Sequence, residues 1–153
     1  MRSALANPRW VEAVLDWDGT WLLSRIALTS AFWIGGLTKL LNFQNAVAEQ
    51  AHFGLRPAAL FAILTICVEL VGSALVISGR LVWLGAGALG VFTGLATLLA
   101  HRFWETTGDA RVEAMNGFFE HLGLIAGLVL ITALSLREQQ RGPSRPDQGK
   151  EAT

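Results

Sequence analysis

The sequence predicts an all-α fold, an integral membrane bundle of four transmembrane helices. Four apolar segments each contain about 20 residues, the length of helix that crosses about 30 Å of hydrocarbon. Hydrophobic residues form 52% of the 153-residue chain, and the mean hydropathy is +0.45. Charged residues form only 16%, compared with about 25% in soluble globular domains. The predicted spans are residues 21–42, 58–78, 81–100 and 117–136, which together form one domain over residues 21–136.

Residues 1–20 are predicted to form an interfacial segment before the first span. Asn7 has the side chain of a helix N-cap. Trp10 and Val14 then recur at helical spacing opposite Glu12, a pattern typical of a short helix that lies on the membrane surface. The alternative is a helix packed beneath the bundle.

The connections between the spans are short or polar. Residues 43–57 form a predicted outer loop that contains a partial helix. Only Gly79 and Arg80 join the second and third spans, so these spans must be antiparallel neighbours. Residues 101–115 are polar and predicted to be partly helical. Residues 137–153 are too polar to bury a core and are predicted to form a disordered tail.

The distribution of lysine and arginine predicts that both termini are cytoplasmic. Four spans place the termini and the turn between the second and third spans on one side of the membrane. That side carries seven basic residues and the other carries three, and basic residues favour the cytoplasmic side. The seven are Arg2, Arg9, Arg80, Arg137, Arg141, Arg145 and Lys150, and the three are Arg56, Arg102 and Arg111.

Composition excludes several classes of site. Twelve basic and twelve acidic residues give a net charge of zero, so no nucleic-acid partner is expected. The single cysteine, Cys67, excludes an intrachain disulfide. The chain lacks a haem-attachment sequence, iron–sulfur cysteines and recurrent metal-ligand spacing, so no intrinsic cofactor and no metal site are predicted. Any redox role would have to use a diffusible quinone, the cofactor of a partner, or protons.

Ionisable residues inside the spans are the candidate functional residues, because lipid makes them costly unless they face a partner or a water-filled cavity. Lys39 and the neighbouring pair Glu120 and His121 lie at similar depths, each about 5 Å from the outer end of its span. His101 ends the third span on the same side, so these four side chains are predicted to cluster. Glu120 shares a helical face with Asn116 that is expected to look into the bundle.

A second polar group is predicted deeper in the membrane. Glu69 lies about 14 Å from the inner end of the second span, and Arg25 lies about 6 Å inside the inner boundary of the first, so Arg25 is expected to reach toward Glu69. Other interpretations stay open: Arg25 and Lys39 can extend to the headgroups, and Glu69 can be a neutral carboxyl. The full candidate ligand-binding set is Arg25, Lys39, Glu69, His101, Trp104, Asn116, Glu120 and His121, and no catalytic residue is assigned.

Four short motifs in these spans resemble the DoxX family of small four-helix bacterial membrane proteins. Each motif is weak alone, but the four occur in the right order across the four spans. One departure is Ala126, where members often have a glycine. The matching residues are Arg25, Gly36, Lys39, Leu40 and Phe43; Glu69, Leu70, Val71, Gly72 and Gly79; His101, Phe103 and Trp104; and Asn116, Phe119, His121, Leu122, Gly123 and Gly127.

The resemblance implies a multi-pass protein of the bacterial cytoplasmic (plasma) membrane. It further implies a membrane subunit or partner of a redox assembly, linked to quinone or to oxidative stress, that uses the intramembrane polar cluster. The expected partners are the lipid bilayer, a redox protein and a second copy of the chain. The alternatives are a small-solute or proton-coupled transporter and a purely structural membrane anchor, and no enzymatic activity is assigned.

Overall fold

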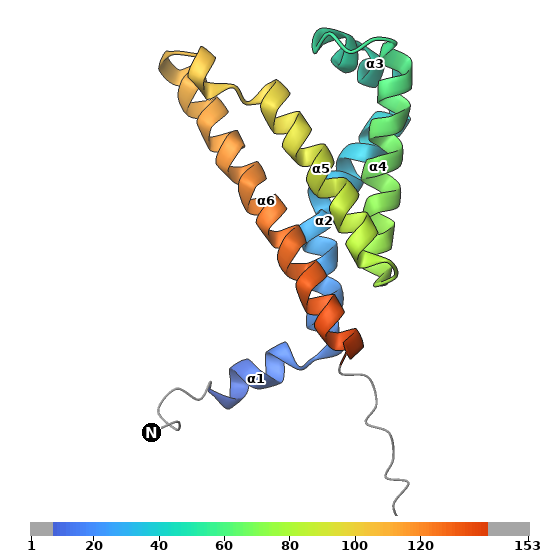
Figure 1. Ribbon diagram of the computed structural model, residues 1–153, viewed down its shortest axis with the longest axis vertical. Helices are drawn as coiled ribbons and strands as arrows, with labels where there is room; N and C mark the ends of the chain where they lie inside the picture. The colour runs from blue at the N-terminus through green and yellow to red at the C-terminus, as the bar shows by residue number, and fades with distance from the viewer. Residues whose placement is uncertain (1–7, 141–153) are drawn as a thin grey trace, which may run out of the picture.

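The computed structural model describes residues 8–140, so the predicted cap Asn7 and the tail from residue 141 onward lie outside the described residues. The described residues, 8–140, form helices joined by short connections and contain no strand (Figure 1). The elements are α1 (Arg9–Leu15), α2 (Asp18–Leu41), α3 (Phe43–His52), α4 (Ala58–Ser78), α5 (Val82–Ala100), the 3-10 helix η2 (Phe103–Glu105) and α6 (Gly108–Gln140).

The described chain is a four-helix membrane bundle, as predicted. Helices α4, α5 and α6 are each long and apolar enough to cross a membrane, and α2 together with α3 forms the fourth candidate span. The termini of the described chain lie at one end of the bundle (Figure 1). We call the opposite end, where α3 and η2 lie, the distal end.

Helix α4 has the bounds that the sequence predicts, and both of its ends have a local cause. Pro57 precedes the first turn, where a missing N–H costs no hydrogen bond. Gly79 follows the last turn with a φ of +72°, a left-handed conformation that glycine adopts without steric cost. The chain then turns at once into α5, so α4 and α5 are antiparallel neighbours, as the short connection predicts.

Helix α6 is longer than the predicted fourth span. It runs from Gly108 to Gln140, which corresponds to about 50 Å of helix, whereas residues 117–136 were expected. The helix is longer than the expected span because an apolar run marks only the part of a helix that suits hydrocarbon. Polar residues at both ends continue the same helix beyond that part.

The first span ends in a sharp bend of 108° between α2 and α3. A Cβ atom on Gly36 would lie 2.9 Å from the side chain of Leu70, so these two residues are level in α2 and α4. From that level α2 continues for about 8 Å to Leu41, while α4 continues for about 18 Å to Ala58. Helix α3 packs against α4 and therefore lies beside the distal half of α4, within the length of the bundle.

The helices approach most closely in the half of the bundle near the termini. A Cβ atom on Gly85 would lie 2.7 Å from the carbonyl oxygen of Gly72, so α5 and α4 meet backbone to backbone. A Cβ atom on Gly127 would lie 2.8 Å from Leu28, which brings α6 onto α2. The buried core lies here and is formed by Phe32, Val76, Val82, Ala86, Leu89, Leu128 and Ile131.

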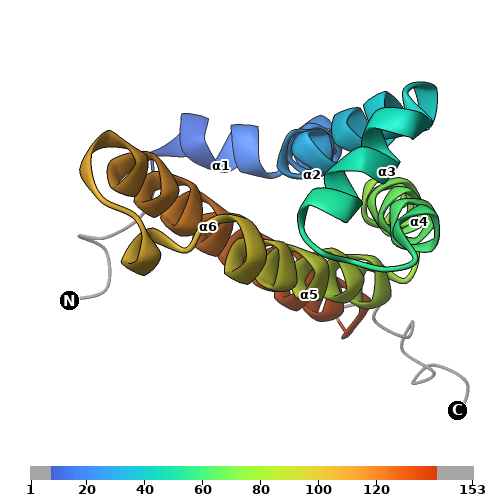
Figure 2. The ribbon, with the colours of Figure 1, turned by 90° about the horizontal axis from the view of Figure 1, so that it is seen from above.

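The helices diverge toward the distal end. In Figure 1, α5 and α6 lean away from α4 above the level where they cross, and Figure 2 shows α3 and α4 on one side and α5 and α6 on the other. Gly90, Gly94 and Gly123 have no neighbouring atom within 4 Å of a built Cβ. These three glycines therefore do not bring helix backbones together, unlike Gly85 and Gly127.

Helix α1 extends away from the bundle (Figure 1) and has no buried residue. Trp10, Val14 and Trp17 are exposed. The alternative of a helix packed beneath the bundle is therefore wrong. Exposed tryptophans are typical of the membrane interface, so an interfacial position stays the prediction for α1.

Candidate ligand-binding cavity

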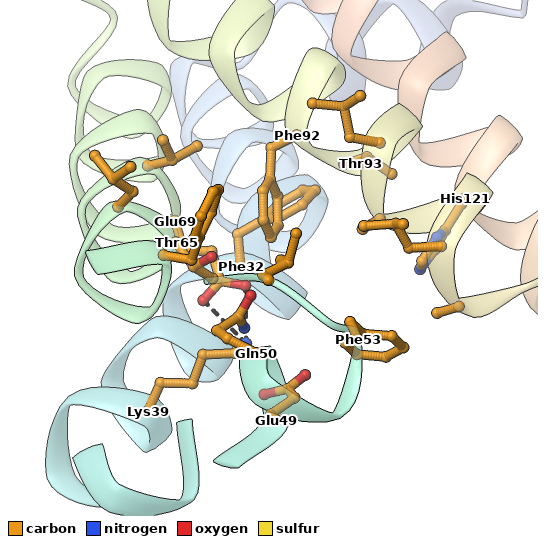
Figure 3. A pocket seen from close by; sticks show the side chains of 18 of the residues that line it. Phe32, Lys39, Glu49, Gln50, Phe53, Thr65, Glu69, Phe92, Thr93 and His121 are labelled. Atoms are coloured by element: carbon orange, nitrogen blue, oxygen red, sulfur yellow. Dashed lines mark hydrogen bonds and ion pairs between the residues drawn. The ribbon is translucent and has the colours of Figure 1, made fainter. Parts of the chain in front are cut away.

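A cavity of about 590 Å³ occupies the distal half of the bundle, where the helices diverge (Figure 3). Its volume is in the range of small-molecule sites, about 300–1,000 Å³. Side chains from α2, α3, α4, α5 and α6 contribute to its wall. Most of the wall is apolar, and the polar side chains gather in two places. These are Lys39, Glu49, Gln50, Thr65 and Glu69 on one side, and His101 and His121 on the other. Thr93 of α5 also lines the cavity.

The first polar group is an ion pair between α2 and α4. Lys39 Nζ lies 2.9 Å from Oε1 and 3.2 Å from Oε2 of Glu69. Glu69 is buried, with 4% of its surface exposed. Gly35 lies beside the pair, and a Cβ there would lie at ordinary contact distance, 3.5 Å from Nζ and 3.7 Å from each carboxylate oxygen. The pair keeps a deep carboxylate in contact with a cation, as low dielectric demands.

The expectation that Arg25 reaches Glu69 is wrong. Gly36 is the α2 residue level with Glu69, and Arg25 precedes it by about 17 Å of helix, farther than its side chain extends. Lys39 lies within one helical turn of the level of Glu69 and is therefore the cation that pairs with it. The Arg25 guanidinium instead lies against Gly79 at the end of α4, where a Cβ would be 2.6 Å from Nη1. A cation there complements the negative end of the α4 dipole.

Helix α3 adds a set of cavity residues that the sequence interpretation missed. Glu49, Gln50 and Phe53 line the cavity, and Gln50 is buried. In the sequence these residues form part of a polar segment that reads as a loop. Only the bend after α2, which turns α3 back along α4, brings them to the site. No local signal predicts that bend.

The second polar group is a histidine pair near the distal end. His121 Nδ1 lies 2.8 Å from Thr97 Oγ1. The Thr97 hydroxyl donates its single proton to the carbonyl oxygen of Thr93, 2.6 Å away. Its oxygen therefore accepts from the Nδ1–H of His121. In the neutral imidazole this assignment leaves Nε2 as a hydrogen-bond acceptor.

His101 packs against His121 from the end of α5. The two rings are edge to face, with centroids 4.7 Å apart. A Cβ on Gly117 would lie 2.6 Å from His101 Nδ1, so glycine at this position makes room for the imidazole. The structure thus brings together the two histidines of the predicted cluster. Lys39 belongs to the same cavity but lies across it, with Glu69 (Figure 3).

Glu120 and Asn116 lie outside the cavity, and both are exposed. The expectation that their face looks into the bundle is wrong, because α6 packs on α5 through the stripe that contains Gly117 and His121. Trp104 is also exposed and packs with Phe103 and Phe118 near η2. These three candidates do not contribute to the cavity.

Comparison with known proteins gives a family for the chain. Residues 20–102 match the DoxX family. The chain belongs to the DoxX family. Inner membrane protein YphA of Escherichia coli (strain K12) is 30% identical over 115 residues, which cover 74% of the chain and 81% of YphA. No solved structure matches the chain. The chain is accordingly a multi-pass bacterial membrane protein.

The match includes Lys39, Glu69 and His101 of this DoxX protein but ends before α6, which supplies His121. The cavity is therefore lined both by residues inside the region that matches the family and by residues of α6 outside it. Chemically, Lys39 is a donor with three N–H groups, of which Glu69 accepts two. In the tautomer whose Nδ1–H donates to Thr97, His121 Nε2 is an acceptor. The polar groups of this DoxX cavity thus include a donor at Lys39 and an acceptor at His121, in a wall that is mostly apolar.

Proposed function

We propose that the protein binds the headgroup of a diffusible quinone in this cavity and serves as the membrane subunit of a redox assembly. The observation that carries the proposal is the placement of Lys39 and His121 on opposite sides of one apolar chamber of about 590 Å³ (Figure 3). Most of the remaining wall is hydrophobic, which favours a lipid-soluble ligand over a hydrophilic solute.

The two polar positions suit both oxidation states of a quinone. Each carbonyl oxygen of a quinone accepts a hydrogen bond, which the third N–H of Lys39 would donate. Each hydroxyl of the reduced form donates one, which His121 Nε2 would accept. Phe32, Phe61 and Phe92 also line the cavity and offer aromatic surface to a quinone ring.

Glu69 supports this arrangement without taking up the ligand position. Its carboxylate holds Lys39 through two contacts and compensates the cation within the bundle. The Lys39 ammonium is therefore held at the cavity wall, where it can donate to a ligand, and does not need to turn toward the headgroups.

A redox partner completes the proposal. Interconversion of a quinone and its reduced form moves two electrons and two protons. The sequence contains no motif for an electron-transfer cofactor, so electrons would pass to or from the cofactor of a partner protein. Such an assembly is the setting in which an oxidative-stress role would arise.

The test is equilibrium binding of a ubiquinone analogue to the purified protein in lipid nanodiscs, corrected for partition into empty nanodiscs. Lys39→Met should weaken binding of the oxidised analogue about tenfold or more, since a hydrogen bond to a charged group contributes about 1.5–3 kcal/mol. His121→Phe should weaken binding of the reduced analogue by about two- to tenfold, since a hydrogen bond between neutral groups contributes about 0.5–1.5 kcal/mol. Glu120→Gln is the matched control, because it is adjacent to His121 and lies outside the cavity. The proposal is wrong if the wild-type protein binds no quinone, or if the cavity variants bind as the control does.

A further inference from the structure

The cavity is open on one side, between α4 and α5. Leu64 of α4 and Leu95 of α5 both line it, yet 49% and 60% of their surfaces are exposed. A side chain that lines a cavity and is also exposed lies at an opening. We call this opening the α4–α5 mouth and define it by Phe61, Leu64, Val68, Phe92, Leu95 and Leu99.

The mouth arises from the crossing of α4 and α5. The two helices touch at Gly72 and Gly85, where no side chain separates their backbones. Beyond this contact they diverge toward the distal end (Figure 1). Leu64 and Leu95 lie on the distal side of this crossing, and both line the cavity.

The mouth opens at the depth of acyl chains. Leu64 lies about 9 Å from the distal end of α4, and Leu95 lies about 8 Å from the distal end of α5. All six residues that define the mouth are hydrophobic. A polar solute would find no hydrogen-bonding partner among these side chains, whereas a hydrocarbon chain would remain in surroundings like those of the bilayer.

The three polar side chains best placed to contact the head of a ligand come from other helices than α4 and α5. Lys39 comes from α2, Gln50 from α3, and His121 from α6, none of which forms the mouth. The exposed lining residues of α4 and α5 therefore give a ligand whose head contacts these groups an apolar exit. The head and the mouth are parts of one continuous cavity.

We infer that the ligand of this site is an amphipathic molecule drawn from the bilayer through the α4–α5 mouth, with a long alkyl or isoprenoid tail that stays in the mouth. The inference rests on the proposed function for the identity of the head. It adds the class of ligand, the route of entry and the side chains that contact the tail. Water-soluble, tailless quinones would then be poor physiological ligands.

The tail position can be tested by photocrosslinking. A benzoquinone with a decyl tail that ends in a diazirine is added to the full chain in nanodiscs of phosphatidylethanolamine and phosphatidylglycerol, and adducts are mapped by mass spectrometry. We expect adducts on residues of the α4–α5 mouth, and we expect excess tailless benzoquinone to compete them away. Competition shows that the labelled tail belongs to a molecule whose head occupies the cavity.

Tryptophan substitutions give a second readout. Leu64→Trp and Leu95→Trp should block the mouth and weaken binding of the decyl quinone about tenfold, the effect expected from overpacking a filled groove. Binding of the tailless quinone should be unchanged. Leu60→Trp and Leu98→Trp are matched controls, since Leu60 and Leu98 are 49% and 56% exposed on the same helices and do not line the cavity.

The outcomes separate the two proposals. If the quinone head binds and responds to Lys39→Met but the tail labels another face, or the mouth variants behave as their controls, the inference is overturned and the proposed function stands. If neither the tailed nor the tailless quinone binds the wild-type protein, the proposed function fails and the inference fails with it.

Discussion

Lys39 and Glu69 form an ion pair, and we expect the loss of stability to differ according to which of the two side chains is replaced. Breaking a buried pair costs about 3–5 kcal/mol when the remaining charge stays buried. The Glu69 side chain is only 6% exposed, so Lys39→Met leaves its carboxylate enclosed and should cost about 3–5 kcal/mol. The Lys39 side chain is 20% exposed and long, so after Glu69→Gln it can turn toward solvent. We therefore expect a smaller cost for Glu69→Gln, about 1–3 kcal/mol.

The double variant Lys39→Met/Glu69→Leu is the decisive measurement. Apolar residues of similar size can replace a buried pair with little loss, so its stability should lie within about 1 kcal/mol of the wild type. The assay is helix loss followed by circular dichroism as sodium dodecyl sulfate displaces a mild detergent. Glu120→Gln is the control and should change stability by no more than about 0.5 kcal/mol. The single variant Glu69→Leu completes the cycle. If the costs of Lys39→Met and Glu69→Leu simply add in the double variant, the two side chains are not coupled and the pairing argument is refuted.

Two pairs of glycine substitutions test the helix packing by the same assay. Gly85→Ala should destabilise the bundle by about 1–3 kcal/mol, because its Cβ would lie 2.7 Å from the carbonyl oxygen of Gly72. Gly90→Ala, on the same helix, places its Cβ where no other atom lies within 4 Å, so it should be neutral or stabilising. A similar effect of both would contradict the close crossing. Gly79→Ala should cost more than Gly54→Ala, since both have positive φ but only Gly79 lies against a guanidinium. Equal costs would show that backbone conformation alone decides.

The site was partly accessible from sequence. Lys39, Glu69, His101 and His121 are polar residues in apolar segments, and that contrast is visible without coordinates. Their pairing was not visible, because it depends on how far one helix is shifted along another. An error of two turns in the relative level of α2 and α4 is enough to exchange Lys39 for Arg25 as the partner of Glu69.

The rotation of a helix about its own axis, which decides which face points inward, could not be predicted from the sequence either. Glu120 and His121 are neighbours in sequence and point about 100° apart, so only one of them can face the cavity. The face of α6 that carries Asn116 and Glu120 was expected to look into the bundle, and it is exposed instead. Packing of α5 on Gly117 and His121 selects the face that the cavity uses.

The sequence by itself determined the membrane class, the helical fold and the positions of the spans along the chain. These follow from local hydrophobicity and from the need to satisfy every backbone hydrogen bond within a helix in lipid. The tertiary structure alone decided the bend that turns α3 toward the cavity, the partner of Glu69, the orientation of α6 and the existence of the α4–α5 mouth. These depend on the levels, rotations and crossings of helices, which arise from contacts between residues far apart in the chain.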